Sequence, residues 1–275
     1  MPQPPRRKGR PKGFNDSTAS TRIQSLDRAL DVLDALSSAK GLTLTELAEN
    51  LQQSPATLYR VLTTFETRGF VETDPVTQTW HVGSSAFRVG SSFLHRSGVL
   101  ERSLPEMHNL MTLTGETANL GIERAGQVLF VSQVETSEAI RAFFPPGTMS
   151  PMYASGIGKA LLSCLSEDQV DRYLRHTSLD AFTPSSIIDE LQLKTDLASA
   201  RQRGWAFDNE EKTTGMRCVA SPIFDVQGEV VAGISISGPT SRMPDEKIAE
   251  FGEAVRTAAG RISIGLGAET GQARR

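Results

Sequence analysis

The sequence predicts an α+β fold with two domains, and three observations support this class. At 275 residues the chain exceeds one average domain, so a division in two is expected. A helix-turn-helix pattern followed by a hairpin pattern occupies the first third of the chain. Helices and strands in an antiparallel order follow, which favours a sheet covered by helices over a doubly wound parallel sheet. With 38% hydrophobic and 22% charged residues the composition is that of a globular chain, and no apolar run approaches the ~20 residues that span a bilayer.

The first 22 residues are strongly basic. Six lysines and arginines stand there against Asp16 alone, a net charge of +5, so the remainder of a chain with formal charge −3 carries −8. Residues 1–21 offer almost nothing for a core and are expected to be a disordered basic arm. Within the arm, Lys8-Gly9-Arg10-Pro11-Lys12 resembles the core of an AT-hook, whose Gly-Arg-Pro segment enters the minor groove of A·T-rich DNA. Arg10 is therefore a candidate DNA contact. The alternative is a solvated tail that only aids solubility.

Residues 22–82 carry the local signals of three helices. A stripe of apolar side chains at helical spacing predicts the first helix over 25–37, where it would brace the other two. Thr43 followed by Glu46 is a capping box, which begins the second helix. Ser54-Pro55 begins the third, because serine caps a helix and proline fits its first position, where the missing N–H costs nothing.

The third helix has one apolar face and one polar face. Its apolar residues recur at i, i+3, i+4 and i+7: Leu58, Val61, Leu62 and Phe65. The polar face and the cap carry small residues, hydroxyls and one arginine, which suit contact with base edges and phosphates: Ser54, Ala56, Thr57, Tyr59 and Arg60. A hairpin pattern around Asp74-Pro75 follows as a wing. The order is that of a winged helix-turn-helix, which places one helix in the DNA major groove; a small helical subdomain that binds protein is the alternative.

A linking helix is predicted over 83–99, a second domain over 100–267 and a tail over 268–275. Gly98 is expected to loosen the chain before the second domain. Helices are expected at 104–113, 158–165, 167–174, 190–203 and 244–266. Strands are expected at 118–123, 127–135, 140–144, 205–207, 216–223 and 230–237.

Six segments resemble the IclR family of bacterial transcription factors, in family order over nearly the whole chain. They are Ser25–Leu30, Ser54–Leu62, Thr114–Leu120, Ala154–Ala160, Gly215–Ala220 and Ile234–Pro239. The resemblance implies a winged-helix DNA-binding domain, a linking helix and a GAF-like C-terminal domain that binds a small effector. It also implies dimers or dimers of dimers. Within the family the chain resembles the glyoxylate-responsive branch, including regulators of the β-hydroxyaspartate cycle, which assimilates glyoxylate.

The residues of the second domain independently support a pocket for a small acid. Gly156-Ile157-Gly158 opens a predicted helix, so its unpaired N–H groups would lie at the positive end of the helix dipole, where carboxylates bind. Ser235 and Ser237 lie two apart in a strand and face the same side, with Cys218 as a small wall. Asp208, placed after a predicted strand, suits the hydroxyls of a hydrated aldehyde such as the gem-diol of glyoxylate. In the glyoxylate-responsive branch, the matching positions line the effector site: Gly156, Ile157, Asp208, Cys218, Ser235 and Ser237.

Met149 and Met152 are expected to close the apolar side of this pocket. Each pocket residue also has a simpler explanation. Gly156 and Gly158 can permit tight packing, the serines can bond to neighbouring backbone, and a cysteine in a strand commonly belongs to the core.

An enzyme is the competing class. Gly156-Ile157-Gly158-Lys159 lacks the glycine spacing of a phosphate loop, and Ala160 stands where Ser or Thr would hold Mg²⁺. The four histidines are scattered without metal-ligand spacing, so no catalytic residue, metal or cofactor is expected. A ligand-free architectural DNA-binding protein is disfavoured by the size of the second domain.

The expected function is therefore a DNA-binding regulator that senses glyoxylate and controls genes of glyoxylate or glycolate assimilation, with pyruvate or glycolate as alternative effectors. An enzyme acting on a small acid is a distant alternative. The expected partners are operator DNA, the effector and further copies of the chain. No membrane association is expected. Two distant cysteines and a basic, proline-rich start without a secretory signal favour the cytoplasm.

Overall fold

The computed structural model describes residues 23–94 and 98–268. The predicted basic arm, with Arg10 and the AT-hook segment, lies outside the described residues, as does all but the first residue of the predicted tail. The chain divides into two compact units, the second of which begins at Leu94. Each unit is described by itself. The predicted α+β class, with a winged helix-turn-helix followed by a sheet covered by helices, is confirmed.

The first unit contains three helices, a two-stranded hairpin and a further helix. The elements are α1 (Gln24–Ser37), α2 (Leu44–Leu51), α3 (Pro55–Thr67), β1 (Val71–Thr73), β2 (Trp80–Val82) and α4 (Ser84–Leu94). The capping box is present: the Glu46 N–H donates to Thr43 Oγ1 at 3.3 Å, and the Thr43 N–H donates to Glu46 Oε2 at 2.8 Å. Ser54 caps α3 with Pro55 in its first turn, as predicted.

The core of the first unit uses only part of the apolar stripe predicted for α1. Leu36 of this stripe is buried together with Leu47, Leu58 and Leu62, and so is Val32, which the predicted stripe did not include. The N-terminal half of the stripe is exposed instead; its members are Ile23, Leu26 and Leu30. The expectation that the whole stripe braces α2 and α3 is therefore wrong, because only the second half of α1 reaches them.

The second unit is built on a six-stranded antiparallel sheet with the strand order β5-β4-β3-β8-β7-β6. The strands are β3 (Thr117–Arg124), β4 (Gln127–Val134), β5 (Met149–Pro151), β6 (Ala206–Asn209), β7 (Met216–Phe224) and β8 (Val230–Pro239). The helices are α5 (Val99–Thr114), α6 (Gly156–Leu162), α7 (Glu167–Arg175), α8 (Glu190–Arg203) and α9 (Asp245–Gly265).

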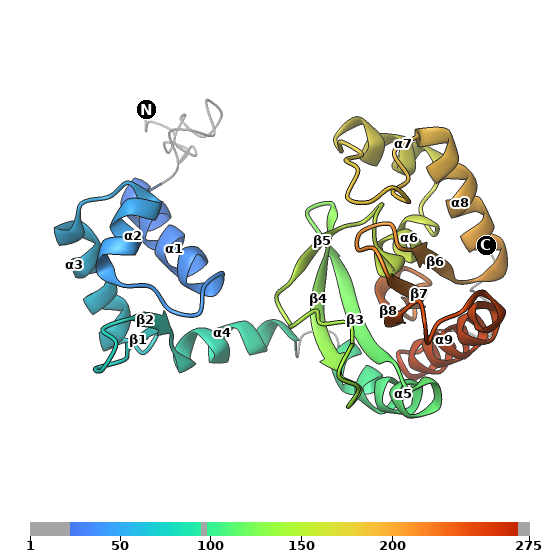
Figure 1. The fold of residues 1–275 in the computed structure, drawn as a ribbon, viewed down its shortest axis with the longest axis horizontal. Coiled ribbons are helices and arrows are strands. Elements are labelled where there is room, and N and C mark those ends of the chain that lie inside the picture. The colour runs from blue at the N-terminus through green and yellow to red at the C-terminus, as the bar shows by residue number, and fades with distance from the viewer. Residues whose placement is uncertain (1–22, 95–97, 269–275) are drawn as a thin grey trace, which may run out of the picture. The chain divides into compact units, whose positions relative to one another are not determined.

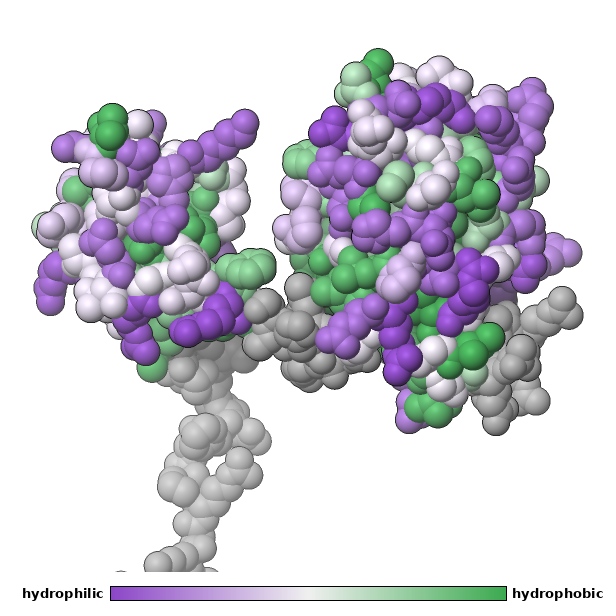
Figure 2. Space-filling view, turned by 90° about the horizontal axis from the view of Figure 1, so that it is seen from below, coloured by the Kyte–Doolittle hydropathy of each residue, from purple (hydrophilic) through white to green (hydrophobic). Residues whose placement is uncertain are grey.

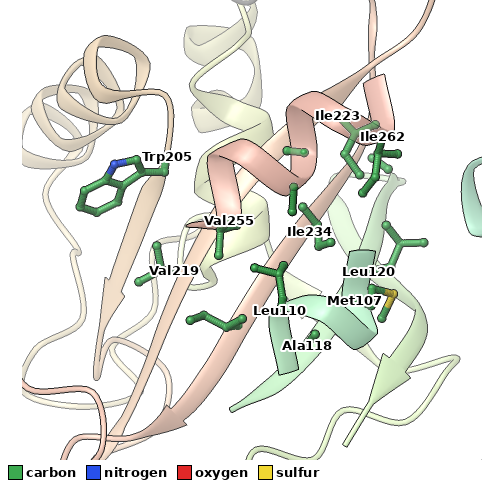
Figure 3. Packing of buried hydrophobic residues seen from close by; sticks show 14 of the residues in the cluster. Met107, Leu110, Ala118, Leu120, Trp205, Val219, Ile223, Ile234, Val255 and Ile262 are labelled. Carbon is green, nitrogen blue, oxygen red and sulfur yellow. The ribbon is translucent and has the colours of Figure 1, made fainter. Parts of the chain in front are cut away.

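The sheet has helices on both faces, and the two faces differ in character. α5 and α9 cover one face over a largely apolar core, in which Leu110, Ile234 and Val255 meet (Figure 3). α6 packs on the other face, with α8 against α6 and β6 (Figure 1). Because side chains alternate along a strand, Ile234 and Ile236 face the apolar core while Ser235 and Ser237 face α6.

One predicted strand is absent and another was missed. Residues 140–144 form no strand. The edge of β4 pairs instead with β5, so that Val128 lies opposite Ser150. The 140–144 segment is held by side chains: Arg242 donates to the Ile140 carbonyl at 2.9 Å, and Phe144 stacks on Phe130 with ring centroids 4.8 Å apart. The apolar run reflects this packing rather than strand pairing.

Two predicted helix starts lie too late in the chain. α5 begins at Val99 rather than 104, so Pro105 lies inside it. The upstream turn forms because Val99 and Ser103 are buried against the core side, and this packing offsets the helix hydrogen bond and the close fit that Pro105 disturbs. Gly98 adopts φ = 66° at the cap of α5. α6 begins at Gly156 rather than 158.

The surface of each unit mixes hydrophilic and hydrophobic residues, as Figure 2 shows for one face. Exposed apolar groups of this kind are common on folded proteins. Within residues 23–94 and 98–268, no helix is long and apolar enough to cross a membrane.

Candidate functional site

The six residues predicted to bind an effector lie around one cavity in the second unit. The cavity leaves about 30 Å³ open to the centres of water-sized molecules, a space that suits a ligand of a few non-hydrogen atoms. Further lining comes from side chains that sequence reasoning did not select, chiefly Phe130, Phe144, Ser150, Lys212 and Arg217.

α6 brings two backbone amides to the cavity. Its cap, Ser155, accepts a hydrogen bond from the Gly158 N–H at 3.1 Å, so the prediction of three unpaired amides is wrong at Gly158. Gly156 and Ile157 occupy the first two helical positions, whose N–H groups have no acceptor within the helix. A Cβ on Gly158 would lie 2.2 Å from the Met152 carbonyl oxygen, so this glycine permits tight packing.

The side chain of Ile157 packs directly on two glycines of the sheet. A Cβ on Gly233 would lie 2.8 Å from Ile157 Cγ2, and one on Gly121 would lie 3.3 Å from Ile157 Cδ1. The side chain is 1% exposed. Close contact with β3 and β8 therefore fixes the position of the Ile157 amide at the cavity.

Ser235 and Ser237 are both buried, but their hydroxyls have different surroundings. Asn119 Nδ2 donates to Ser237 Oγ at 3.3 Å, and Gln133 Nε2 donates to Asn119 Oδ1 at 3.0 Å. Ser235 is 0% exposed, and its Oγ makes no hydrogen bond of ordinary geometry among the described residues. Its polar neighbour is the Cys218 thiol, a weak partner whose pKa the hydroxyl acts to lower. Buried hydroxyls are normally satisfied, so this oxygen marks a place where a polar partner is missing.

A fully buried lysine lies beneath the cavity. Lys159 is 0% exposed, and its Nζ lies 2.5 Å from Glu211 Oε1 and 2.8 Å from Asp196 Oδ2. It also donates to the Phe207 carbonyl oxygen at 2.5 Å. Sequence reasoning considered Lys159 only as part of a phosphate loop. Its actual partners come from β6, α8 and the loop after β6, which no local pattern connects.

Asp208 lies within β6, opposite Cys218 on β7, rather than after a strand. Its Oδ1 accepts the Glu211 N–H at 2.9 Å. Desolvation raises the pKa of Asp208 to about 6, although Lys159 opposes the shift. Desolvation likewise raises the pKa of Glu211 to about 7 and that of the Cys218 thiol to about 11. A carboxylate with a pKa of about 6 and a neutral thiol therefore lie side by side in the cavity lining.

The apolar side of the cavity is aromatic. Phe130 and Phe144 line it as a stacked pair, whereas Met149 and Met152 do not line it. The expectation for the two methionines is therefore wrong. Met149 is turned out on the edge strand β5, and Met152 packs beneath Gly158. No sequence signal predicted Phe144 here, because its segment resembled a strand.

The candidate DNA-contacting residues cluster at the start of α3. Ser54, Ala56, Thr57, Tyr59 and Arg60 are all exposed. The Thr57 N–H donates to Ser54 Oγ at 3.2 Å, and the two hydroxyls lie 2.9 Å apart. The cap therefore holds both hydroxyls in place, and the face combines fixed polar groups with one long basic side chain.

The fold and these two sites define a class of protein: a regulator with a DNA-binding helix-turn-helix domain and a separate domain with a small polar cavity. Two family models match the chain, the IclR helix-turn-helix domain over residues 25–75 and the bacterial transcriptional regulator IclR C-terminal domain over residues 91–264. The chain belongs to the IclR family of transcriptional regulators.

Similar proteins agree with this assignment. The HTH-type transcriptional regulator BhcR of Paracoccus denitrificans is 52% identical over 95% of both chains. The transcriptional repressor IclR of Escherichia coli is 39% identical over 96% of this chain and 97% of that protein. The crystal structure of the Thermotoga maritima IclR matches with a TM-score of 0.76 at 30% identity, over 90% of this chain and all of that one. The family and these relatives are transcriptional regulators rather than enzymes.

Proposed function

We propose that this regulator senses glyoxylate in the cavity and controls genes of glyoxylate or glycolate assimilation. The observation that carries the proposal is the buried, weakly partnered Ser235 hydroxyl beside Asp208 in a very small cavity. A ligand that supplied its hydrogen bond would remove the cost of leaving a buried polar group unsatisfied, about 1–3 kcal/mol.

In the proposed complex the carboxylate lies against α6 and β8. The Gly156 and Ile157 amides and the Ser235 and Ser237 hydroxyls would donate to it. α6 is a short helix of seven residues, so the direction of these donors matters more than the helix dipole. Asp208 would accept from the hydroxyls of the hydrated aldehyde, since a carboxylate with a pKa of about 6 is largely ionised at neutral pH.

The dimensions of the cavity favour the smallest 2-oxo acids. The cavity is small and its open side is narrowed by the stacked Phe130 and Phe144 rings, which suits a ligand of a few non-hydrogen atoms. Pyruvate and glycolate are the alternative effectors. Pyruvate adds a methyl group that the Phe130 and Phe144 rings would contact, whereas glycolate has a single hydroxyl for Asp208. The 52% identity to BhcR supports the assignment to the glyoxylate-responsive branch and to regulation of the β-hydroxyaspartate cycle.

The first unit is proposed to bind the operator through the start of α3, with Arg60 as the charged contact and the basic arm adding phosphate or minor-groove contacts. Homodimers or dimers of dimers are proposed as the working form. The exposed apolar stripe at the start of α1 supports self-association (Ile23 66%, Leu26 54% and Leu30 49% exposed). Light scattering that returned only monomer at micromolar concentration would contradict this.

Calorimetry with the full chain tests the effector. Glyoxylate is expected to bind, to raise the melting temperature of the second unit and to change affinity for the DNA upstream of the regulator's own gene. Acetate should bind much more weakly, because it lacks the hydroxyls that Asp208 would accept from.

Ser235→Ala is expected to weaken glyoxylate binding about tenfold, the value of one buried hydrogen bond to a charged group. Ser199→Ala is the matched control, since Ser199 is an exposed serine on α8. If wild type does not bind glyoxylate, or binds acetate equally well, the effector assignment is wrong.

A further inference from the structure

The buried charged group to which the lining residue Asp208 belongs carries more negative than positive charge. Asp208, Glu211 and Asp196 surround the single ammonium of Lys159, whose ion pairs with Glu211 and Asp196 are 2.5 and 2.8 Å long. With all three carboxylates ionised, this group carries a charge of −2. Like charges repel strongly where water is largely excluded, so an arriving carboxylate needs a cation nearby.

Two cationic side chains line the cavity, and one of them already has a carboxylate partner. Arg217 Nε donates to Asn209 Oδ1 at 2.8 Å, and its Nη1 donates to the Met243 carbonyl oxygen at 2.7 Å. Its Nη2 lies 2.8 Å from the Asp245 carboxylate. Each guanidinium nitrogen therefore has a partner within the protein, and Arg217 holds β6, β7 and the start of α9 together.

Lys212 is the other cation, and not all of its N–H groups are used in hydrogen bonds to the described residues. Its Nζ donates to Ser150 Oγ at 2.7 Å, which uses one of the three N–H groups of the ammonium. Among the described residues no carboxylate forms an ion pair with it. Burial lowers the pKa of Lys212, and Asp208 opposes that shift. The ammonium is thus partly desolvated without a contacting counter-ion, and an anion beside it would restore the lost interaction.

The loop that carries Lys212 is held at several points. The Gly215 N–H donates to Glu210 Oε2 at 2.7 Å, and the Glu210 N–H donates to the Met216 carbonyl oxygen at 3.1 Å. Ser186 Oγ donates to the Glu211 carbonyl oxygen at 2.5 Å. The backbone on both sides of Lys212 is therefore fixed, and its ammonium is held at the cavity by the hydrogen bond to Ser150, another lining residue.

We infer that Lys212 determines specificity for anionic effectors by placing an unpaired ammonium beside the bound carboxylate. The inference rests on the proposed effector function of this cavity. The amides and serines recognise the shape of a carboxylate, whereas Lys212 recognises its charge. A neutral molecule of the same size would gain the hydrogen bonds without the ionic interaction.

Lys212→Met tests this, because methionine keeps most of the stem and removes the charge. Calorimetry compares glyoxylate with glyoxylamide, which has the same aldehyde hydrate and a neutral amide in place of the carboxylate. Wild type is expected to bind glyoxylate more tightly than glyoxylamide. In Lys212→Met the ratio of the two affinities should fall about tenfold, mainly because glyoxylate binds more weakly. Added salt should weaken glyoxylate binding to wild type more than to the variant.

Lys194→Met is the matched control, since Lys194 is an exposed lysine of the same unit that pairs with Asp171 on the surface. It should leave the preference unchanged. Equal loss of both ligands in Lys212→Met would show that Lys212 only supports the loop, and an unchanged preference would remove it from charge recognition. Both outcomes overturn the inference while glyoxylate binding by wild type remains. Failure of wild type to bind glyoxylate would instead reject the proposed function.

Discussion

The start of α3 and the cavity of the second unit both present polar groups, but they are built in opposite ways. The α3 surface comes from one continuous segment, and its side chains from Ser54 to Arg60 are exposed except that of Leu58. The cavity takes residues from five strands, one helix and the loops between them, and its key hydroxyl is 0% exposed. One site is a face of a helix, and the other exists only after the sheet has formed.

This difference determines how each site responds to change. A side chain on the exposed face of α3 can be removed without disturbing the core, so DNA affinity and stability are separable there. On β8 the two serines of the cavity alternate with core residues, as Ser235 does with Ile234 and Ile236. Changes at this side of the cavity are therefore expected to affect stability as well as the proposed effector binding.

The largest effect is expected from the core side of β8. Ile234→Ala should lower the free energy of unfolding of the second unit by about 2–5 kcal/mol, because it leaves a cavity beneath α5 and α9. Ile140→Ala removes the same atoms from a side chain that is 69% exposed, and it should lower the free energy of unfolding only slightly. Urea unfolding followed by fluorescence reports this core, since Trp205 belongs to it. Equal losses in the two variants would show that the strand faces are misassigned.

A smaller effect, confined to DNA binding, is expected on α3. Arg60→Ala should weaken operator binding by about 1–3 kcal/mol and leave the melting temperature unchanged, because the side chain is exposed. Arg68→Ala, at the far end of the same helix, is the control for loss of one positive charge. Gel-shift titrations at one salt concentration measure both. An unchanged affinity in Arg60→Ala would remove this residue from the DNA contacts.

The smallest effect is expected from pH. Burial raises the pKa of Asp208 from 3.8 to about 6 and that of Glu211 from 4.5 to about 7. Between pH 4 and 7 the folded state therefore holds more protons at these groups than the unfolded chain does. Their contribution to stability must then fall as pH rises through this range, and the loss persists above it.

Melting temperatures at pH 5.5 and 8.0 test this sign. Between pH 5.5 and pH 8.0 the melting temperature of wild type should fall more than that of Asp208→Asn, whose side chain cannot ionise. Asp171→Asn, a surface carboxylate paired with Lys194, is the control and should follow wild type. Parallel pH dependence in wild type and Asp208→Asn would show that Asp208 titrates near its ordinary pKa.

Sequence patterns predicted the features that depend on near neighbours. Thr43 with Glu46 and Ser54 with Pro55 specify helix starts because the hydrogen bonds they form span three residues. The spacing of Ser235 and Ser237 predicted their common face, because strand geometry has a period of two. The family resemblance brought Asp208 and Cys218 to the same site, and these residues pair across β6 and β7 in the structure.

Tertiary structure alone decided what depends on distant partners. Phe144 lies on Phe130 because β5, rather than the 140–144 segment, takes the edge of β4. Lys159 is neutralised by α8 and by the loop after β6, and Lys212 lies in the cavity because that same loop is tied to its neighbours. Hydrogen bonds within a turn are specified by adjacent residues. The burial and charge of a side chain depend on every element packed around it, and only the folded chain brings those elements together.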